Sequence, residues 1–270
     1  MVKLPRSRTP AAMGDLDILK RYVATTFVIS ASGRIERGPS RRVGPRRDSA
    51  EEIAAGPRVF FAGCSAGNIV HVRHDADDQT ASRIIAAAEN EPPWSDIETP
   101  PRCLDEIVDL LSGSTPVEII GPEVFFTMPN DLTYEPSYAH SAVIAEADTT
   151  EGDRLLDRLE REGMPPLLLE AGFLGLEDFW WPWCVALDGR EILSIAFSPH
   201  LSEAAAEIGV FTFPPFRGCG LAAAVSACWS SSQGLKGRTL TYCTPTRNRS
   251  SRNVAARLGL RSVGARILIG

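Results

Sequence analysis

The sequence has no apolar run of the ~18–20 residues that a membrane-spanning helix requires. Its first 24 residues are basic but contain no continuous apolar segment of the signal-peptide kind. With 44% hydrophobic and 23% charged residues, the composition also excludes the disordered and collagen-like classes. We therefore expect a globular, cytoplasmic protein without a membrane partner, whose 270 residues form one large domain or two smaller ones.

Paired cysteines are also missing. The six cysteines stand singly, without the Cys-x-x-Cys pairs that bind zinc. Reduced, mostly buried thiols are expected in a cytoplasmic chain. His71 and His74 would face opposite ways on an extended strand, because positions i and i+3 alternate. The sequence therefore predicts no metal site.

Lysine is scarce, with three in the chain, and the last 63 residues contain no acidic side chain. The net charge is +8 over residues 1–47, −23 over residues 48–207 and +9 over residues 208–270. The acid-free segment indicates a surface that meets an anion, and the acidic middle would attract a cationic amine or polyamine. Nucleic acid is not the expected partner, because aromatic and basic residues are not interleaved as in a stacking groove.

Periodicity and turn residues predict the secondary structure. In the first half, strands are predicted within residues 21–35 and at 59–62, 69–72 and 118–128, and helices at 79–91 and 103–112. In the second half, strands are predicted at 141–147, 183–187, 192–198, 208–213, 239–243 and 263–269, and helices at 151–162, 221–232 and 251–258. The first half is α+β in character and carries no motif that points to chemistry.

Two glycines precede the predicted helix 221–232. Gly218 and Gly220 let the backbone approach a ligand, and the free N–H groups at the start of the helix favour an anion such as pyrophosphate. The segment Phe213-Pro214-Pro215-Phe216-Arg217-Gly218-Cys219-Gly220-Leu221-Ala222 resembles the acetyl-CoA loop of the GNAT N-acetyltransferase superfamily. Further along, Asn248-Arg249-Ser250-Ser251 and the helix ending in Leu258-Gly259-Leu260 resemble its second signature, with Leu260 in place of the usual Phe.

The resemblance covers residues 138–270 and implies a mixed, mostly antiparallel GNAT-type sheet flanked by helices. Residues 1–137 would be a smaller α+β region of open role. The cosubstrate implied is acetyl-CoA, with its pyrophosphate on residues 217–222 and its pantetheine in a splay between strands 208–213 and 239–243. The cofactor-binding residues implied are Val210, Phe211, Thr212, Phe213, Arg217, Gly218, Cys219, Gly220, Leu221, Ala222, Asn248 and Ser251.

In direct acyl transfer, an amine loses a proton and attacks the thioester carbonyl. Glu207, the last acidic residue before the acid-free segment, is the candidate base, although a solvated carboxylate at a strand end is an equal alternative. A backbone N–H near Val210 or Phe211 would stabilise the oxyanion. Asn248 matches a position near the reacting thioester. The proton donor to the thiolate is Tyr242 or solvent, since the Tyr that many family members carry after the second helix is missing.

Two further alternatives concern cysteine and the acceptor site. Cys219 or Cys243 would serve in a covalent route only with an activating base, and no His lies nearby in sequence. Trp181, within the aromatic cluster 179–183, and His200 are candidate acceptor contacts. A packing role for the aromatic cluster and a surface position for His200 are the alternatives.

These observations predict an N-acetyltransferase that moves an acetyl group from acetyl-CoA to a primary amine. The acceptor is a small molecule or an amine of a peptide or protein, and a homodimer is compatible with the sequence. A GNAT-like module that binds acyl-CoA without turnover is the alternative.

Overall fold

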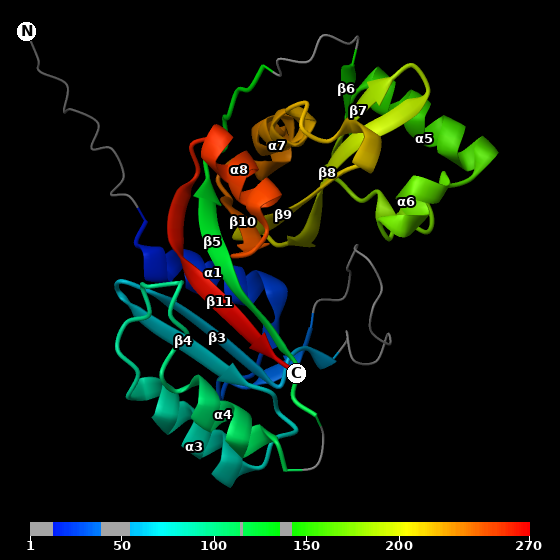
Figure 1. Ribbon diagram of the computed structural model, residues 1–270. Coiled ribbons are helices and arrows are strands. Elements are labelled where there is room, and N and C mark those ends of the chain that lie inside the picture. The colour runs from blue at the N-terminus through cyan, green and yellow to red at the C-terminus, as the bar shows by residue number, and fades with distance from the viewer. Residues whose placement is uncertain (1–12, 39–54, 114–115, 136–141) are drawn as a thin grey trace, which may run out of the picture.

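The computed structural model describes residues 13–38, 55–113, 116–135 and 142–270, which form a twisted sheet with helices on both faces (Figure 1). The strands of the sheet are β3 (Val59–Cys64), β4 (Gly67–Val72), β5 (Ile119–Met128), β6 (Val143–Glu146), β7 (Cys184–Asp188), β8 (Glu191–Leu201), β9 (Ala205–Thr212), β10 (Thr239–Pro245) and β11 (Arg261–Ile269). The helices are α1 (Asp15–Thr26), α3 (Asp78–Glu89), α4 (Leu104–Leu111), α5 (Thr150–Glu162), α6 (Pro166–Glu170), α7 (Leu221–Ser231) and α8 (Arg249–Arg257). The shorter elements are the strands β1 (Val28–Ile29) and β2 (Ile35–Arg37) and the 3-10 turns η1 (Leu176–Asp178), η2 (Pro214–Phe216) and η3 (Gln233–Leu235).

The sheet has nine strands in the order β4-β3-β11-β5-β10-β9-β8-β7-β6. Neighbouring strands are antiparallel except β9 and β10, which are parallel. The parallel pair is joined by a crossover through α7, as a parallel connection requires. The predicted class, a mostly antiparallel mixed sheet flanked by helices, is confirmed.

Strand β5 comes from the first half of the chain but lies between β10 and β11 of the second half (Figure 1). Its register runs from Leu240↔Met128 on one side to Ile269↔Ile119 on the other. Strands from both sides of the predicted domain boundary at residues 137/138 therefore belong to one sheet. The boundary itself lies outside the described residues, and the division into two domains stays a prediction.

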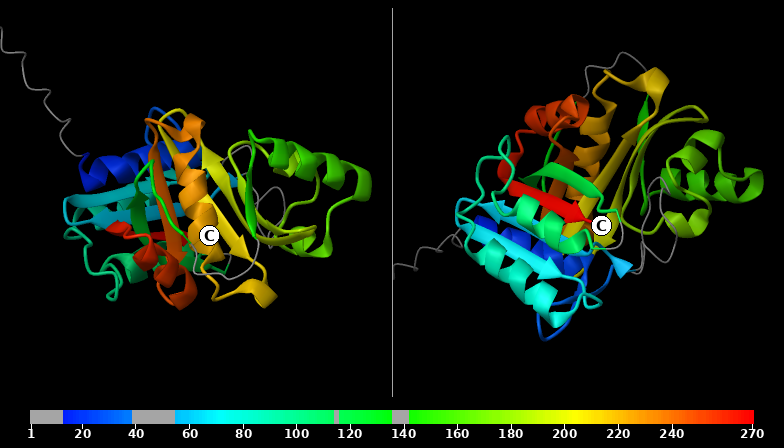
Figure 2. Two further views of the ribbon diagram at one scale, coloured as in Figure 1. Left: turned by 90° about the horizontal axis from the view of Figure 1, so that it is seen from above. Right: turned by 60° about the horizontal axis from the view of Figure 1, so that its bottom comes forward.

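Helices cover both faces of this sheet (Figure 2). Phe61 packs with α3 and α4, whereas its neighbour Phe60 packs with α1, because successive strand residues point to opposite faces. In the other half, Ala186 packs with α7 and Val185 with α5. On β10, Tyr242 packs with the α7 cluster, and the next residue faces α1. Helices α1 and α5 therefore share one face, and α3, α4, α7 and α8 lie on the other.

Helix α1 corrects the sequence analysis, which predicted a strand within residues 21–35. Residues 15–26 are helical, and only the short β1 and β2 follow. The buried residues are Ile18, Leu19, Tyr22, Val23 and Thr26, which recur at three- and four-residue intervals. The β-branched residues favour a strand locally, but burial of this stripe against the sheet decides the structure.

The other predicted elements are present, with ends shifted by a few residues. Helix α5 begins one residue before the predicted start, and the hydroxyl of its N-cap Thr149 accepts a hydrogen bond from Gly152 N–H. Helix α6, which begins at Pro166, was not predicted. Among the described helices, none combines the length and low polarity that crossing a bilayer demands.

Candidate active site

Strands β9 and β10 part after a short paired stretch, and the unpaired edge of β9 is called the opening below. The two strands pair only from Ala205↔Thr239 to Glu207↔Thr241. Beyond Glu207, β9 continues to Thr212 and pairs on its other side with β8, but β10 no longer follows it. The predicted splay is therefore present, and half-buried Val210, Phe211 and Thr212 of the predicted set lie along it. A strand edge exposed inside a sheet offers backbone groups to an extended ligand.

From the unpaired edge of β9 the chain continues through η2 to the start of α7. Gly218 and Gly220 both have φ of +83°, and Gly220 is the N-cap of the helix. No side chain caps α7, and its first turn contains no acidic residue. A Cβ at Gly218 would meet nothing within 4 Å, so the loop is open there. Uncapped N–H groups, the helix dipole and the open loop together suit an anion.

Among the predicted loop residues, Arg217 has the most exposed functional group. Its Nε donates to Thr212 O at 3.0 Å, and its guanidinium lies 5.9 Å from the centre of the Phe211 ring. Phe213 and Leu221 are buried in the core, at 0% and 2% exposure, so only their backbones can reach a ligand. The charge at this end of the opening is thus supplied by Arg217.

Three predicted residues meet at the start of α8. Asn248 is the N-cap, and its Oδ1 accepts the Ser251 N–H at 3.1 Å. The hydroxyls of Ser251 and Tyr242 are 2.5 Å apart. Tyr242 is buried, which raises its pKa. The helix cap accounts for Asn248 structurally, and the catalytic roles of Asn248 and Tyr242 stay predictions.

Glu207 belongs to a buried charged cluster on the α1 face. Its Oε2 lies 3.4 Å from His200 Nε2 and accepts a hydrogen bond from Tyr22 Oη at 3.5 Å, while Oε1 lies 3.4 Å from Arg266 Nη2. Arg266 Nε in turn donates to Glu123 Oε2 at 2.6 Å. Glu207 is 6% exposed, so the alternative of a solvated carboxylate does not apply. The Arg266 guanidinium therefore contacts the carboxylates of both Glu207 and Glu123.

Burial affects both members of the Arg266–Glu123 pair. It raises the pKa of the Glu123 carboxyl to about 7 and lowers the pKa of the Arg266 guanidinium to about 9. The 2.6 Å contact opposes both shifts, because it favours the charged forms. No local motif in the sequence points to Arg266, Glu123 or Tyr22, because they come from β11, β5 and α1 and meet only in the folded protein.

Of the two cysteines near the opening, Cys243 does not resemble an activated nucleophile. Burial, followed by the neighbouring Glu207 carboxylate, raises the pKa of Cys243 well above its usual range. Cys219 Sγ donates weakly to Arg217 O at 3.7 Å. The thiolate that a covalent route through Cys243 requires is therefore disfavoured.

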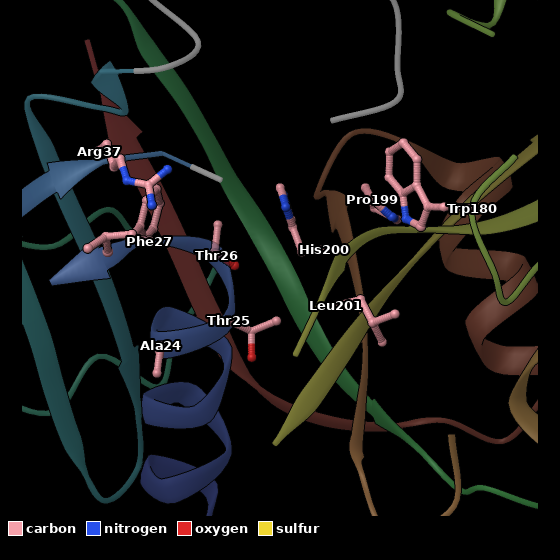
Figure 3. A pocket seen from close by; sticks show the side chains of 10 residues that line it. Ala24, Thr25, Thr26, Phe27, Arg37, Trp180, Pro199, His200 and Leu201 are labelled. Carbon is pink, nitrogen blue, oxygen red and sulfur yellow. The ribbon is translucent and has the colours of Figure 1, made fainter. Parts of the chain in front are cut away.

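The two predicted acceptor contacts lie in different surroundings. His200 lines a cavity of about 290 Å³ between α1 and the end of β8 (Figure 3). Trp181 does not line it: its Nε1 donates to Asp148 Oδ2 at 2.6 Å, and its ring packs on the Gly234 backbone. The neighbouring Trp180 does line the cavity, with its Nε1 donating to Ser198 O at 2.8 Å. The aromatic cluster thus contributes a wall through Trp180.

Potential metal ligands gather elsewhere. His71 and His74 each contact a backbone carbonyl through Nδ1, at 2.8 and 3.2 Å. Within the part of the chain that the structure describes, Glu146, Cys184 and Cys228 are the one group whose ligand atoms all lie within 4.8 Å of one another. The two sulfurs are 2.7 Å apart. This group joins β6 and β7 to the middle of α7, away from the charged cluster on the opposite face.

Comparisons with known proteins give similar folds only. No family model matches the chain, and no curated protein matches it. Similar solved structures include a tandem GNAT protein from the clavulanic acid biosynthesis pathway (10% identity, TM-score 0.47, 96% of each chain covered). They also include a GCN5-related N-acetyltransferase-like protein from Streptococcus suis (18% identity, TM-score 0.44, 82% of this chain and 85% of that chain).

A GCN5-related N-acetyltransferase from Kribbella flavida is similar over a shorter span. The match has 16% identity and a TM-score of 0.40, and it covers 62% of each chain, less than two thirds. GNAT acetyltransferases are thus among the solved structures to which this chain is similar. The features of the chain itself that bear on function are the opening beside β9, the uncapped start of α7 and the buried cluster around Glu207.

Proposed function

We propose that the protein is an acetyltransferase that moves an acetyl group from acetyl-CoA to a primary amine. The observation that carries the proposal is the course of the opening, which starts where Glu207 pairs with Thr241 and leads to the uncapped, glycine-bounded start of α7. A long ligand with an anion at one end and a reactive group at the other fits this arrangement. Both loop signatures of the GNAT resemblance lie beside it.

The residues present fit acetyl-CoA. Its pyrophosphate would be held by the N–H groups of residues 218–222 and by Arg217, because a helix N-terminus and a guanidinium both favour phosphate. Its pantetheine would lie along residues 208–212, where β9 lacks a partner on the β10 side. The thioester it brings is the acyl donor, and a backbone N–H near Val210 or Phe211 would stabilise the oxyanion.

Glu207 and His200 would act together on the amine. His200 lines the cavity and its Nε2 contacts Glu207, so a proton leaving the amine passes to the imidazole while the buried carboxylate stabilises the resulting cation. Arg266 holds the other carboxylate oxygen. In this arrangement His200 is the base, and Glu207 is the positioning residue behind it.

Tyr242 is the candidate proton donor to the leaving thiolate. It faces α7 and α8, whereas Glu207 faces α1, so the two groups lie on opposite faces of the sheet beside the opening. A phenol whose pKa is raised by burial remains protonated at neutral pH and can therefore donate its proton to the thiolate. Solvent is the alternative donor.

The test combines binding with turnover. We expect acetyl-CoA to raise the melting temperature more than dephospho-CoA does, and a panel of amines to release CoA thiol. Glu207→Gln should lower kcat/KM by about 10²–10⁴-fold and alter its pH profile, while acetyl-CoA binding is retained. Glu203→Gln, at an exposed carboxylate in the turn before β9, is the matched control and should behave like the wild type.

Three other outcomes would contradict all or part of the proposed function. Acetyl-CoA binding without thiol release on a broad amine panel would favour a non-catalytic acyl-CoA-binding module. Steeply salt-dependent DNA binding without a CoA effect would favour a nucleic-acid binder. A Glu207→Gln enzyme with wild-type turnover and pH profile would remove the role proposed for this residue.

A further inference from the structure

The cavity beside His200 is built largely by the first half of the chain. Its walls are the end of α1 and the residues that follow, β2, the end of β8 and the loop before β7 (Figure 3). The lining residues are Ala24, Thr25, Thr26, Phe27, Val28, Arg37, Trp180, Pro199, His200 and Leu201. Thr25 Oγ1 lies 2.8 Å from Ser202 Oγ, which ties α1 to the turn between β8 and β9.

This cavity adjoins the charged cluster at the start of the opening. His200 belongs to the cavity wall, and its Nε2 lies 3.4 Å from Glu207 Oε2. On the sheet, Glu207 pairs with His200 on one side and with Thr241 on the other. A group bound against His200 is therefore separated from the opening by the width of strand β9.

Thr26 contributes a buried polar atom that no other described residue satisfies. The residue is 5% exposed, and its Oγ1 has no hydrogen-bond partner within the described residues. A buried hydroxyl without a partner is unfavourable, and such groups are normally satisfied. Because Thr26 lines the cavity, a polar group of a ligand placed there would satisfy it.

The charges of the lining residues favour a negatively charged group on the ligand. Among the described residues, Arg37 and His200 line the cavity and no carboxylate does, although residues 48–207 as a whole carry −23. No carboxylate of the described residues forms an ion pair with Arg37. Figure 3 shows Arg37 on one side of the cavity, Trp180 and Pro199 on the other, and His200 between them. A polyamine would meet a cation here, whereas a carboxylate would find a partner.

The remaining walls are apolar. Phe27, Trp180, Pro199 and Leu201 supply aromatic and aliphatic surface around a volume of about 290 Å³. This volume suits one small molecule rather than a folded partner. The lining thus combines a cation, a hydroxyl and apolar surface with a base, His200, which is one strand away from the opening.

We propose that this cavity binds the acceptor, and that the acceptor is a free α-amino acid with an apolar side chain. Its carboxylate pairs with Arg37 and the Thr26 hydroxyl, its side chain packs near Trp180, and its amine extends from His200 across the width of β9 toward the thioester in the opening. The proposal rests on the proposed function and names its substrate class. The amine nitrogen forms a bond to the acetyl carbon while the carbon–sulfur bond breaks. Of the three ammonium protons, one goes to His200, one ends on the CoA sulfur and one stays on the amide.

The test compares matched acceptors in the thiol-release assay. We expect kcat/KM for phenylalanine and leucine to exceed that for phenethylamine, phenylalaninamide and spermidine by about tenfold or more, since the latter lack the carboxylate. Arg37→Gln should raise KM for phenylalanine by about tenfold or more and leave phenethylamine unchanged. Arg83→Gln, at an exposed arginine of α3, is the control and should change neither.

The variant Thr26→Val separates an effect on ligand binding from an effect on folding. Because the hydroxyl has no partner within the described residues, the variant should melt at or above the wild-type temperature and yet bind phenylalanine more weakly. A lower melting temperature with unchanged phenylalanine binding would show a structural role and count against the proposal.

Calorimetric titration of phenylalanine, with and without CoA, separates this proposal from the proposed function. Binding that Arg37→Gln abolishes, without any acetyl transfer, would support the cavity assignment and contradict the acetyltransferase. Acetyl transfer that neither Arg37→Gln nor Thr26→Val changes, or that is faster with spermidine than with phenylalanine, would overturn the cavity assignment. The proposed acetyltransferase activity would remain supported.

Discussion

At the scale of the residue, Arg266 determines how two carboxylates can be buried in one sheet. It contacts Glu123 and Glu207 and lies 5.0 Å over the Tyr22 ring. Two buried carboxylates side by side would repel each other, and the guanidinium between them removes much of that cost. Glu207, the residue that positions the candidate base His200, thus contacts residues from three other elements, β8, β11 and α1.

Removing Arg266 should therefore destabilise the protein strongly. We expect Arg266→Met to lower the free energy of unfolding by about 3–5 kcal/mol, because it leaves two buried carboxylates without their cation. Urea unfolding measures the change. Arg261→Met on the same strand removes the more exposed ion pair with Asp15 and should cost ~0–1 kcal/mol. Equal effects of the two substitutions would contradict the role given to Arg266.

Glu123 should make stability depend on pH. Burial raises its folded pKa to about 7 from an ordinary 4.5, so the folded state binds more protons than the unfolded state between these values. Its favourable contribution is complete below pH 4.5 and is lost as the pH rises through 7. Urea unfolding at pH 5, 6 and 7.5 should show this loss in the wild type and not in Glu123→Gln. Parallel pH profiles for the two proteins would contradict the assignment.

The residue scale also shows what the sequence can predict about the site. Gly218 and Gly220 lie in a contiguous motif whose neighbours determine its shape, so the loop could be predicted. Glu207 could be chosen because it precedes the acid-free segment. Its partners could not, because Arg266 and Tyr22 come within reach only when strands and helices distant in sequence pack together.

At the scale of the element, the turn before α7 and the turn before β10 offer a matched comparison. Gly218 and Gly237 have φ of +83° and +82°, and a Cβ at either position would meet nothing within 4 Å. The two glycines thus share their conformation and their open surroundings. They differ in that Gly218 lies in the loop to which the proposed pyrophosphate binds.

Alanine at either position should cost roughly 1–2 kcal/mol of stability, because a residue with Cβ is strained at positive φ. Acetyl-CoA affinity should fall in Gly218→Ala and not in Gly237→Ala. Chemical unfolding and calorimetric titration of acetyl-CoA measure the two quantities. If both variants bound acetyl-CoA like the wild type, the pyrophosphate would not lie on this loop.

Elements also differ in how well local patterns predict them. Helix α5 could be predicted because its apolar stripe and its Thr149 cap agree. Helix α1 could not, because Val23, Thr25 and Thr26 favour a strand and only burial under the sheet favours the helix. Because α1 forms one wall of the acceptor cavity, the cavity could not be predicted from the sequence either.

At the scale of the whole molecule, the two halves of the chain share one sheet. Strand β5 pairs with β10 on one side and with β11 on the other. The order of strands could not be predicted, because pairing between distant segments has no local signal in the sequence. The cavity formed by α1, β2 and β8 likewise draws on both halves.

The second half should therefore not fold without the first. A fragment of residues 138–270 lacks β5, which leaves β10 and β11 with exposed edges in the middle of the sheet. We expect it to be insoluble or to lack a cooperative unfolding transition, as judged by circular dichroism. Coexpression with residues 1–137 should restore cooperative unfolding and acetyl-CoA binding. A fragment that melts like the intact protein would contradict this expectation.

The place of β11 between β3 and β5 has a consequence for synthesis of the chain. Ile269 pairs with Val59 and with Ile119, so the contact order of the sheet is high and folding is expected to be slow. During synthesis on the ribosome, β3 and β5 are made well before their shared partner β11. Synthesis of residues 129–260, which separate β5 from β11, takes on the order of ten seconds. During that interval the nascent chain exposes two apolar strands with open edges, and it should depend on chaperones that shield them.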